Sequence, residues 1–461
     1  MNAALLPAVE QLALLQQRKI SPLELVNEHI ARIERWNPVL NALVDFDPER
    51  AREQARAVNN GLLSGLPLTV KSSIATQGYR CEIGSVLHRG DVAQQDAEAV
   101  ARLRRAGAVI LGTTNCPELL MAYETDNFLY GRTNNPWALD RTAGGSSGGE
   151  AAAIAAGLSA GGLGSDSGGS VREPAHFSGI CALKPTSGRI PSAGHLPPCT
   201  GPFSILGSIG PMARTIADVD LLFRTVAGRH PADPSGAPVS MRNISIAEAK
   251  QIPIGWFEDD GLTPVMPETR QAVRDAAAAL ERQGFNVAPF RPSSLEEARR
   301  LWHIFFVQCG AMFYAPLISG REKELSPVFR DFLEIAHAQS PLTAESLLQA
   351  WSDCDTVRGQ LLAEMQDFPI LLLPVCSIPA FRHGERKWMV EGQEVRYLDA
   401  MRYTQWFNLL AAPAAVVPVG RSDEGLPIGV QIAGRPFDDE LVLAVAAAVE
   451  SEFGYRPPPL A

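Results

Sequence analysis

Apolar residues recur at helical spacing through the first part of the chain. Residues 4–35 carry them every three or four positions, and Ser21 followed by Pro22 forms a helix start within that stretch. Residues 48–60 have the polar composition of an exposed third helix. The pattern predicts a set of N-terminal helices over residues 1–60.

Short apolar runs that are typical of buried strands follow. The run LPLTVK (66–71) ends on a lysine, and a helical segment at 96–107 is followed directly by AVILGTTN (108–115). Helices that alternate with strands indicate a layered α/β fold. The C-terminal part repeats this pattern with predicted strands at 369–375, 414–420 and 426–434 and a closing helix at 438–450.

The region between these strands is mostly helical. Residues 265–285 and 293–365 have helical periodicity, residues 231–246 have the composition of a loop, and 301–317 is the most aromatic segment. No internal repeat divides the chain. We therefore expect a single domain over 1–461, made of the N-terminal helices (1–60), a core (61–230), a variable helical region on the substrate side (231–370) and the C-terminal part of the core (371–461).

The composition is that of an ordinary globular protein, with 46% hydrophobic and 20% charged residues. The net charge of −10, without any run of basic residues, argues against nucleic acid as a partner. The seven cysteines form no C-x-x-C pair and the eight histidines are isolated. We therefore expect reduced thiols, no metal and no cofactor.

The chain begins with MNAALLPAVEQLALLQQRK, which has no basic residue before its apolar part. A secretory signal would need one, and a membrane-spanning helix would need about 18 to 20 consecutive apolar residues, which the sequence lacks. The sequence therefore predicts no signal peptide, no membrane span and a cytoplasmic location. A homodimer remains an open alternative for its assembly.

Residues 131–180 are rich in Gly, Ser and Ala. They include GGSSGG (144–149), directly before a predicted helix at 150–158, and GSDSGGS (164–170). Serine hydroxyls are candidate nucleophiles, and glycines let backbone N–H groups approach a ligand closely, as an oxyanion hole or a phosphate cradle requires. From these residues alone, a tight connection between packed elements is an equally good interpretation.

Other motifs fit this segment less well. The G-x-S-x-G pattern of a nucleophile elbow occurs at 144–148, 145–149 and 157–161, but no convincing strand precedes Gly144, and Gly161 fits a helix C-cap. No G-K-[ST] follows, which excludes a P-loop, and a serine interrupts G-x-G-x-x-G. Lys71 alone is typical of a solvated strand end, the alternative being a buried neutral base.

Taken together, these segments resemble the amidase signature family. The matching stretches are LPLTVK (66–71), GRTNNPW (131–137), TAGGSSGGEAAAIAAG (142–157), LGSDSGGSVREPAHFSGICALKPTSGRIP (163–191) and GSIGPMARTIADV (207–219), with weaker matches at 408–420 and 425–434. The resemblance implies an α/β/α sandwich in which helices surround a large mixed, twisted sheet. It also implies that residues 61–230 are the amidase signature core.

The same resemblance implies a catalytic triad of Lys71, Ser146, which would follow a cis peptide bond, and the nucleophile Ser170. It further implies an oxyanion hole made of Ser167, Gly168, Gly169 and Ser170. The supporting loop residues that it implies are Gly145, Ser147, Asp166 and Arg172. Ser72 stands where the family commonly has Asp, so we expect the anchoring of Lys71 to differ. Ala143 and Ser178 also replace residues that are common in the family, Pro and Cys.

The implied activity is hydrolysis of the C–N bond of an amide through a Ser170 acyl-enzyme. The sequence around Glu150 is more similar to the fatty-acid-amide-hydrolase and acetamidase branches than to the glutaminase chain of the tRNA amidotransferase. The aromatic segment would either line a substrate pocket or belong to the core, and its candidates are Trp302, Phe305, Phe306, Phe313 and Tyr314.

Such a pocket would suit aryl amides or aryl carbamates (urethanes), and the family also contains esterases. Two other functions stay open. One is a glutaminase-type amidotransferase subunit that acts only with partner chains. The other is a non-catalytic module that binds an anion in its Gly/Ser loop.

Overall fold

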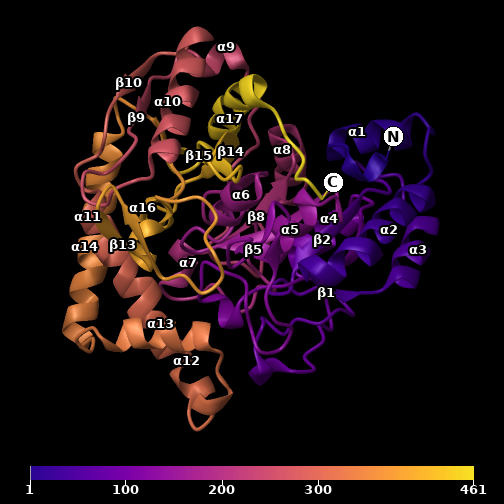
Figure 1. Ribbon diagram of the computed structural model, residues 1–461, viewed down its shortest axis with the longest axis horizontal. Coiled ribbons are helices and arrows are strands. Elements are labelled where there is room, and N and C mark those ends of the chain that lie inside the picture. The colour runs from indigo at the N-terminus through magenta and orange to yellow at the C-terminus, as the bar shows by residue number, and fades with distance from the viewer. Residues whose placement is uncertain (1, 461) are drawn as a thin grey trace.

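The computed structural model describes residues 2–460 and centres on one sheet of eleven strands (Figure 1). The strands follow one another across the sheet in the order β1-β3-β2-β6-β8-β7-β14-β15-β11-β9-β10. In chain order their bounds are β1 Leu43–Phe46, β2 Pro67–Lys71, β3 Val109–Thr114, β6 Gly161–Asp166, β7 Cys181–Lys184, β8 Ser208–Ala213, β9 Ile254–Trp256, β10 Val287–Pro289, β11 Ile370–Pro374, β14 Ala414–Arg421 and β15 Pro427–Gly434.

The sheet is mixed, as the sequence predicted. Strand β2 runs parallel to both β3 and β6, whereas β6 pairs antiparallel with β8. Because β2 and β6 are parallel neighbours, their carboxyl ends emerge at the same edge of the sheet. The residues that end these strands, Lys71 and Asp166, are therefore brought to one place from positions 95 residues apart in the chain.

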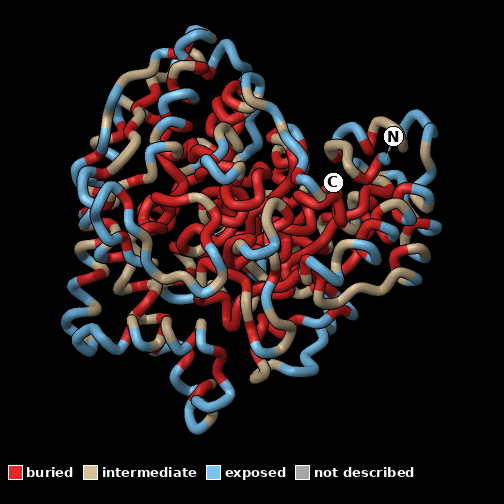
Figure 2. The backbone as a smooth tube through the Cα atoms, viewed as in Figure 1, coloured by how far each residue is buried: buried red, intermediate tan, exposed pale blue. Residues whose placement is uncertain are grey.

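Helices pack on both faces of the sheet. Along β14, Ala415 and Val417 join the hydrophobic cluster that contains the helices α10 (Pro267–Arg282) and α17 (Asp439–Phe453). Val416, between them, joins the cluster with α5 (Gly148–Ala155) and α6 (Arg172–Ser178). Successive strand residues point to opposite faces, so the two helix groups lie on opposite sides of the sheet. The predicted α/β/α sandwich is thus confirmed, and Figure 2 shows the buried chain concentrated in its centre.

The rest of the chain contains the α-helices of the fold and the loops that join them. Their bounds are α1 Ala8–Gln16, α2 Pro22–Leu40, α3 Pro48–Arg56, α4 Glu98–Arg105, α5 Gly148–Ala155, α6 Arg172–Ser178, α7 Phe203–Leu206, α8 Ile216–Val226, α9 Ile246–Ala249, α10 Pro267–Arg282, α11 Leu295–Trp302, α12 Cys309–Ile318, α13 Pro327–His337, α14 Ala344–Glu364, α15 Tyr397–Ala400, α16 Arg402–Leu409 and α17 Asp439–Phe453.

The start of α2 follows the sequence signal directly. The Ser21 side chain accepts a hydrogen bond from Glu24 N, and the Glu24 carboxylate accepts one from Ser21 N at 2.8 Å, with Pro22 at the first helical position. This reciprocal capping satisfies N–H groups that the helix leaves without internal partners.

Two local predictions near the Gly/Ser segment were wrong. Gly161 is not a helix C-cap, because α5 ends at Ala155 and Gly161 begins the central strand β6. A short strand, β5 (Ala138–Thr142), does precede Gly144, but it pairs with β4 (Asn134–Asn135) in a separate two-stranded ribbon. A second such ribbon joins β12 (Lys387–Val390) and β13 (Gln393–Arg396).

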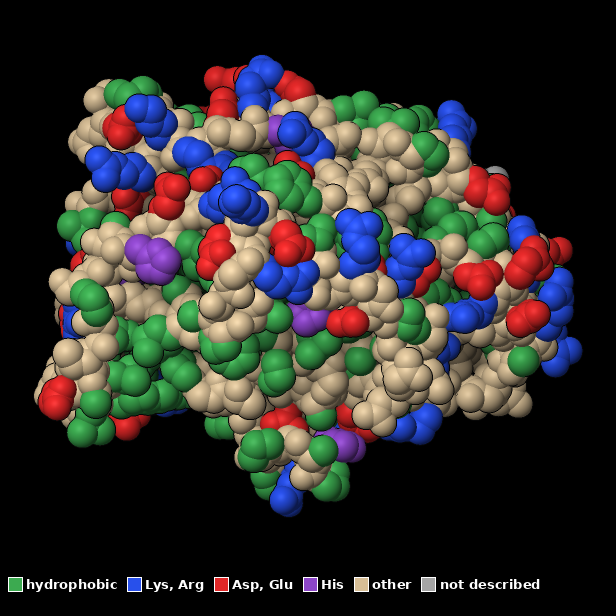
Figure 3. Space-filling view, turned by 90° about the horizontal axis from the view of Figure 1, so that it is seen from below, with side chains coloured by type: hydrophobic (Ala, Val, Ile, Leu, Met, Phe, Trp, Pro, Cys, Tyr) green, Lys and Arg blue, Asp and Glu red, His purple; other side chains and the backbone are tan. Residues whose placement is uncertain are grey.

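The aromatic segment forms one long helical stretch, Leu295–Ile318, in which a π-helical turn, His303–Gln308, joins α11 to α12. By length and composition alone this stretch could cross a membrane, but half of its apolar window is buried inside the molecule, as in a core helix. On the molecular face in Figure 3, side chains of both charge signs are interspersed.

Candidate active site

Lys71 lies at the carboxyl end of β2 and is completely buried. Its Nζ is 2.6 Å from Ser146 Oγ and 3.1 Å from Ser165 Oγ. Burial lowers the pKa of Lys71 to about 8, although the nearby Cys116, Asp166 and Glu150 side chains oppose the shift. Removing an ammonium group from water disfavours its charged form, so a substantial part of this lysine is neutral in mildly alkaline solution.

Ser146 precedes α5 and follows a cis peptide bond at Gly145. A Cβ atom on Gly145 would lie 2.5 Å from Glu124 O, so the close approach of these two backbones requires glycine. Ser147 N donates to Ser170 O at 3.1 Å, which ties the GGSSGG loop to the loop that follows β6. Lys71, Ser146 and Ser170 are thus brought to one site by two loops and the end of a strand.

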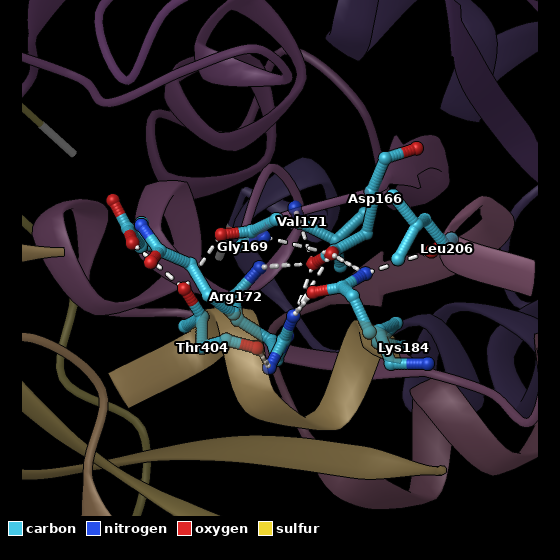
Figure 4. Close-up of polar contacts among 12 residues, drawn as sticks. Asp166, Gly169, Val171, Arg172, Lys184, Leu206 and Thr404 are labelled. Atoms are coloured by element: carbon cyan, nitrogen blue, oxygen red, sulfur yellow. Dashed lines mark hydrogen bonds and ion pairs between the residues drawn. The ribbon is translucent and has the colours of Figure 1, made fainter. Parts of the chain in front are cut away.

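A buried ion pair fixes the loop that carries Ser170. Asp166 ends β6, and its two carboxylate oxygens accept hydrogen bonds from Gly169 N at 2.8 Å and Val171 N at 3.0 Å (Figure 4). The same oxygens bind the Arg172 guanidinium at 2.9 and 3.0 Å, and Asn408 donates a further bond at 3.0 Å. Burial raises the pKa of Asp166, but Arg172 lowers it well below its usual range, so the carboxylate stays ionised.

The N–H groups of the loop differ in availability. Gly169 N is already bound to Asp166, although the sequence placed it among the oxyanion donors. Within residues 2–460, the N–H groups of Ser167, Gly168 and Ser170 donate no hydrogen bond. These three groups are therefore free to bind an oxygen of a ligand, and the fourth is not.

Side chains from other parts of the chain donate hydrogen bonds to two carbonyl groups of the same loop. The Trp302 indole donates to Ser167 O at 2.9 Å, while the Tyr123 and Thr404 hydroxyls donate to Gly168 O at 2.9 and 2.7 Å. Thr404 belongs to α16, which also supplies Asn408 to Asp166. The sequence analysis missed Tyr123, Thr404 and Asn408, because hydroxyl and amide side chains scattered through the chain carry no local signal of a shared site.

Two neighbours of Lys71, Ser72 and Glu150, make polar contacts with other groups. The Ser72 hydroxyl lies 3.3 Å from Cys116 Sγ rather than at the lysine. Glu150 accepts hydrogen bonds from the hydroxyls of Thr69 and Thr114 at 2.6 and 2.8 Å. Burial raises the pKa of Glu150 to about 8, so this carboxyl group is mostly protonated at neutral pH.

A cavity of about 1020 Å³ opens beside Ser170. Trp302 and Phe306 line it, with their rings stacked at a centroid distance of 4.8 Å, and Phe332 contributes to the same apolar wall. The charged residues that line it are largely paired, for example Arg386 with Asp331 at 3.1 Å. The cavity therefore combines an aromatic wall with charged side chains that are largely paired.

The other aromatic candidates lie elsewhere. Phe305 is buried against Trp351, at a centroid distance of 4.7 Å, and does not line this cavity. Phe313 is 44% exposed and also lies outside it. Tyr314 is buried, and its hydroxyl donates to Leu119 O at 2.9 Å. The prediction that these three line the large cavity is wrong, because Phe305 and Tyr314 are buried in other contacts and Phe313 packs on Phe203 at a centroid distance of 6.2 Å.

A second, smaller pocket of about 30 Å³ lies on another side of Ser170. Ser146 lines it together with His195, Cys199 and Phe203. Burial lowers the pKa of His195 to about 4 and raises that of Cys199 to about 12, so both side chains are uncharged at neutral pH. Among residues 2–460, no group of three or more His, Cys, Asp or Glu side chains is arranged to hold a metal ion.

The chain matches known proteins along most of its length. The family model described as Amidase matches residues 24–443. An acylamidase of Rhodococcus erythropolis is 35% identical, covering 98% of this chain and 96% of that protein. An indoleacetamide hydrolase of Bradyrhizobium diazoefficiens is 32% identical, over 97% and 86%.

Two further matches bear on the choice between functions. A glutamyl-tRNA(Gln) amidotransferase subunit of Roseiflexus castenholzii is 33% identical, over 95% of this chain and 94% of its own. The crystal structure of a bacterial aryl acylamidase of the amidase signature enzymes has a TM-score of 0.86 at 27% identity, over 97% and 96% of the two chains.

Proposed function

The chain belongs to the amidase signature family and is an amide C–N hydrolase, and we propose that it acts through an acyl-enzyme on Ser170. The observation that carries this proposal is the position of Lys71, buried with its Nζ 2.6 Å from Ser146 Oγ in a site that also contains Ser170. A buried amine with a lowered pKa can serve as the base that a serine nucleophile requires.

In the first half of the reaction, Ser170 Oγ attacks the carbonyl carbon of the amide. Its proton passes to Ser146, whose own proton passes to the neutral amine of Lys71. The tetrahedral intermediate then collapses, the C–N bond breaks, and Lys71 returns the proton through Ser146 to the leaving nitrogen. The acyl group stays on Ser170 as an ester.

In the second half, water attacks the ester carbon and gives a proton to the same relay. The bond between Ser170 Oγ and the acyl carbon breaks, Ser170 regains its proton, and the carboxylic acid leaves. The balance is one amide and one water to one acid and one amine. All the protons move among Lys71, Ser146 and Ser170, so no histidine is required.

We propose the backbone N–H groups of Ser167, Gly168 and Ser170 as the donors that stabilise the tetrahedral oxyanion. Gly169 is left out of this set because its N–H is bound to Asp166. Fixed donors of this kind are typically worth about 100- to 1,000-fold in rate each. The ion pair of Asp166 and Arg172 would hold them in place before the substrate arrives.

The aromatic wall of the large cavity supports aromatic amides as substrates. The names of two relatives, an indoleacetamide hydrolase and an aryl acylamidase, point to aromatic substrates as well. Aryl carbamates and esters also present a carbonyl group to Ser170, so we extend the proposal to them as further substrates. Comparing their rates of hydrolysis with that of the amide ranks the three.

The test measures hydrolysis of a bulky aryl acetamide, the matching ester and an aryl carbamate by wild type and Ser170→Ala at pH 8. We expect Ser170→Ala to lose at least about 1,000-fold in kcat on every substrate that wild type hydrolyses. Ser352→Ala, at an exposed serine on α14, is the matched control and should keep full activity. Equal activity of Ser170→Ala and wild type would contradict the proposal.

The amidotransferase alternative predicts a different result in the same assay. A glutaminase-type subunit that needs partner chains would leave all three substrates intact as a purified chain. Hydrolysis by the purified chain would therefore favour the free-standing hydrolase.

The anion-binding alternative has less support from the site. Asp166 already supplies a carboxylate to the loop, where it accepts bonds from Gly169 N and Val171 N. A module that bound phosphate in this loop would also show no covalent labelling of Ser170 by an organophosphonate.

A further inference from the structure

The peptide unit between Gly168 and Gly169 separates two of the proposed oxyanion donors, the N–H groups of Gly168 and Ser170. Its N–H end is bound to Asp166 at 2.8 Å, and its carbonyl end accepts a hydrogen bond from the Thr404 hydroxyl at 2.7 Å (Figure 4). Gly169 has a φ of +125°, a conformation that only glycine adopts readily, so the hydrogen bonds at both ends hold the orientation of the unit. The groups that bind the Gly168 carbonyl therefore help to aim both donors.

Thr404 has a single hydroxyl proton but lies near three acceptors. Its Oγ1 is 2.7 Å from Gly168 O, 3.0 Å from Glu173 Oε1 and 3.1 Å from Met401 O. If Glu173 were a carboxylate, it would compete with the Gly168 carbonyl for that proton, and a charged acceptor binds a hydroxyl more strongly than a neutral one. If Glu173 carries a proton, its own O–H donates to Thr404, and the Thr404 hydroxyl is left to the Gly168 carbonyl.

Glu173 lies in surroundings that favour its neutral acid. It is completely buried in the first turn of α6, and its Oε2 has no hydrogen-bond partner among residues 2–460. The neighbouring Arg172 directs all five of its N–H bonds elsewhere, namely to Asp166, Asn408, Gln431 and the Thr404 carbonyl. A buried carboxylate without a cation to pair with costs far more free energy than the buried acid.

The other ionisable groups that face Glu173 add no positive charge. They come from the end of β6, the loop before β4, the segment after β11 and α15, and they are Asp166, Tyr123, Cys376 and Tyr397. Burial raises the pKa of the thiol and of both phenols well above their usual range, so these three stay uncharged at neutral pH. Burial likewise raises the pKa of Glu173 well above its usual range, although Thr404 and Arg172 oppose the shift.

Building on the proposed acyl-enzyme mechanism, we propose that Glu173, as a neutral acid, is a positioning residue for the oxyanion hole. Its Oε1–H donates to Thr404 Oγ1, and the Thr404 hydroxyl donates to Gly168 O. The proton stays on Glu173 throughout the reaction. Tyr123 donates to the same carbonyl at 2.9 Å, so breaking the chain of hydrogen bonds loosens the loop without releasing it. The effect falls on kcat more than on KM, because the donors act on charge that develops in the transition state.

Steady-state kinetics on an aryl amide test this chain of hydrogen bonds. Glu173→Met keeps the side-chain length without its polar atoms, and Thr404→Val keeps the shape without the hydroxyl. We expect each to lower kcat at least about tenfold and to change KM less than about twofold. Glu173→Gln supplies an amide N–H as the donor and should keep kcat within about threefold of wild type. Because the two residues act in series, the double variant Glu173→Met/Thr404→Val should lose no more than about twofold beyond Thr404→Val alone.

Glu82→Met is the matched control. Glu82 is also a buried glutamate whose Oε2 has no partner within the described chain, but it lines neither cavity, so kcat should stay unchanged. An unchanged kcat in Glu173→Met would overturn the proposal. A loss in Glu173→Gln as large as that in Glu173→Met, or losses that multiply in the double variant, would overturn it as well.

Infrared spectroscopy of the full chain tests the proton itself and requires no turnover. In the spectrum of wild type minus that of Glu173→Gln at pH 8, we expect the C=O band of a protonated carboxyl group and no carboxylate bands. The other carboxyl groups cancel, because both proteins contain them. Carboxylate bands would overturn the proposal even if Glu173→Met fails to fold. An acid band in a wild type that hydrolyses no amide would instead contradict the proposed function.

Discussion

At the scale of single residues, the proposed base Lys71 gives a definite expectation for the pH dependence of the reaction. Burial lowers its pKa to about 8, and only the neutral amine accepts a proton. The neutral fraction grows as the pH increases, so kcat/KM should rise about tenfold per pH unit below 8 and level off above it. A pH–rate profile on a neutral amide checks this. A rate that is flat or falls between pH 7 and pH 9 would contradict a lysine base.

Asp166 is the second residue whose replacement gives a definite expectation. Asp166→Asn keeps the size of the side chain but leaves the buried Arg172 guanidinium without its counter-ion, which typically costs about 3–5 kcal/mol. It also weakens the bonds to Gly169 N and Val171 N that hold the loop. We expect a lower free energy of unfolding together with a loss of kcat.

Denaturant unfolding and steady-state kinetics on the same sample test both effects. Asp353→Asn is the control. Asp353 pairs with Arg300, and 46% of the Arg300 side chain is exposed. Such a surface pair is worth at most about 1 kcal/mol. Equal stability of Asp166→Asn and the control would show that the buried pair is not the anchor we describe.

At the scale of elements, the long helical stretch Leu295–Ile318 reaches the catalytic loop through one hydrogen bond. The Trp302 indole N–H donates to Ser167 O, and its ring stacks on Phe306. Trp302→Phe keeps an aromatic ring but removes the donor, which leaves the partly buried Ser167 carbonyl without its partner at a cost of about 1 kcal/mol.

We expect this variant to lose about tenfold in kcat with little change in KM, because the loop carries the proposed oxyanion donors and is not proposed to bind the rest of the substrate. Trp351→Phe is the matched control, since Trp351 packs on Phe305 away from the loop. A change in KM alone would mean that Trp302 acts only as a cavity wall.

The central strand β6 has no recognisable strand pattern in the sequence, where Gly161 fits a helix C-cap instead. Glycine is unfavourable in strands in general, yet Gly161, Gly162 and Gly164 lie in the middle of the sheet. A Cβ on Gly162 would lie 2.0 Å from Glu150 Oε1 and 2.2 Å from Thr69 O. Glycine is required at Gly162 because the Glu150 side chain of α5 and the backbone of β2 lie against it, whereas an added Cβ at Gly161 would meet Leu222 of α8. These are tertiary requirements with no local signature.

Gly162→Ala should therefore destabilise the protein by about 3 kcal/mol or prevent its folding, because backbone and buried carboxyl atoms cannot move aside. Gly359→Ala is the matched control. Gly359 lies within α14 with nothing within 4 Å of an added Cβ, so the change should stabilise by about 0.5–1 kcal/mol. Thermal unfolding of both variants compares them. A stable Gly162→Ala protein would contradict the packing described for β6.

At the scale of the whole molecule, the sequence predicted the strands that are apolar runs. It also predicted the part of the site whose residues are contiguous in the chain. The runs at 108–115 and 426–434 became β3 and β15, and residues 142–191 carried both serines and the Asp166 loop. What the sequence could not show is how distant parts close on that loop. Arg172 binds Gln431 from β15 at 2.6 Å, and the carbonyls are held from Tyr123, Trp302 and Thr404.

The central claim concerns the covalent bond on Ser170, and the most direct measurement is peptide mapping by mass spectrometry after acid quenching of a turnover reaction. With a bulky aryl primary amide in excess, we predict that the acyl mass is added to the peptide containing Ser170. The adduct should be absent from Ser170→Ala. An acyl adduct on another residue, or turnover that persists in Ser170→Ala, would contradict the account.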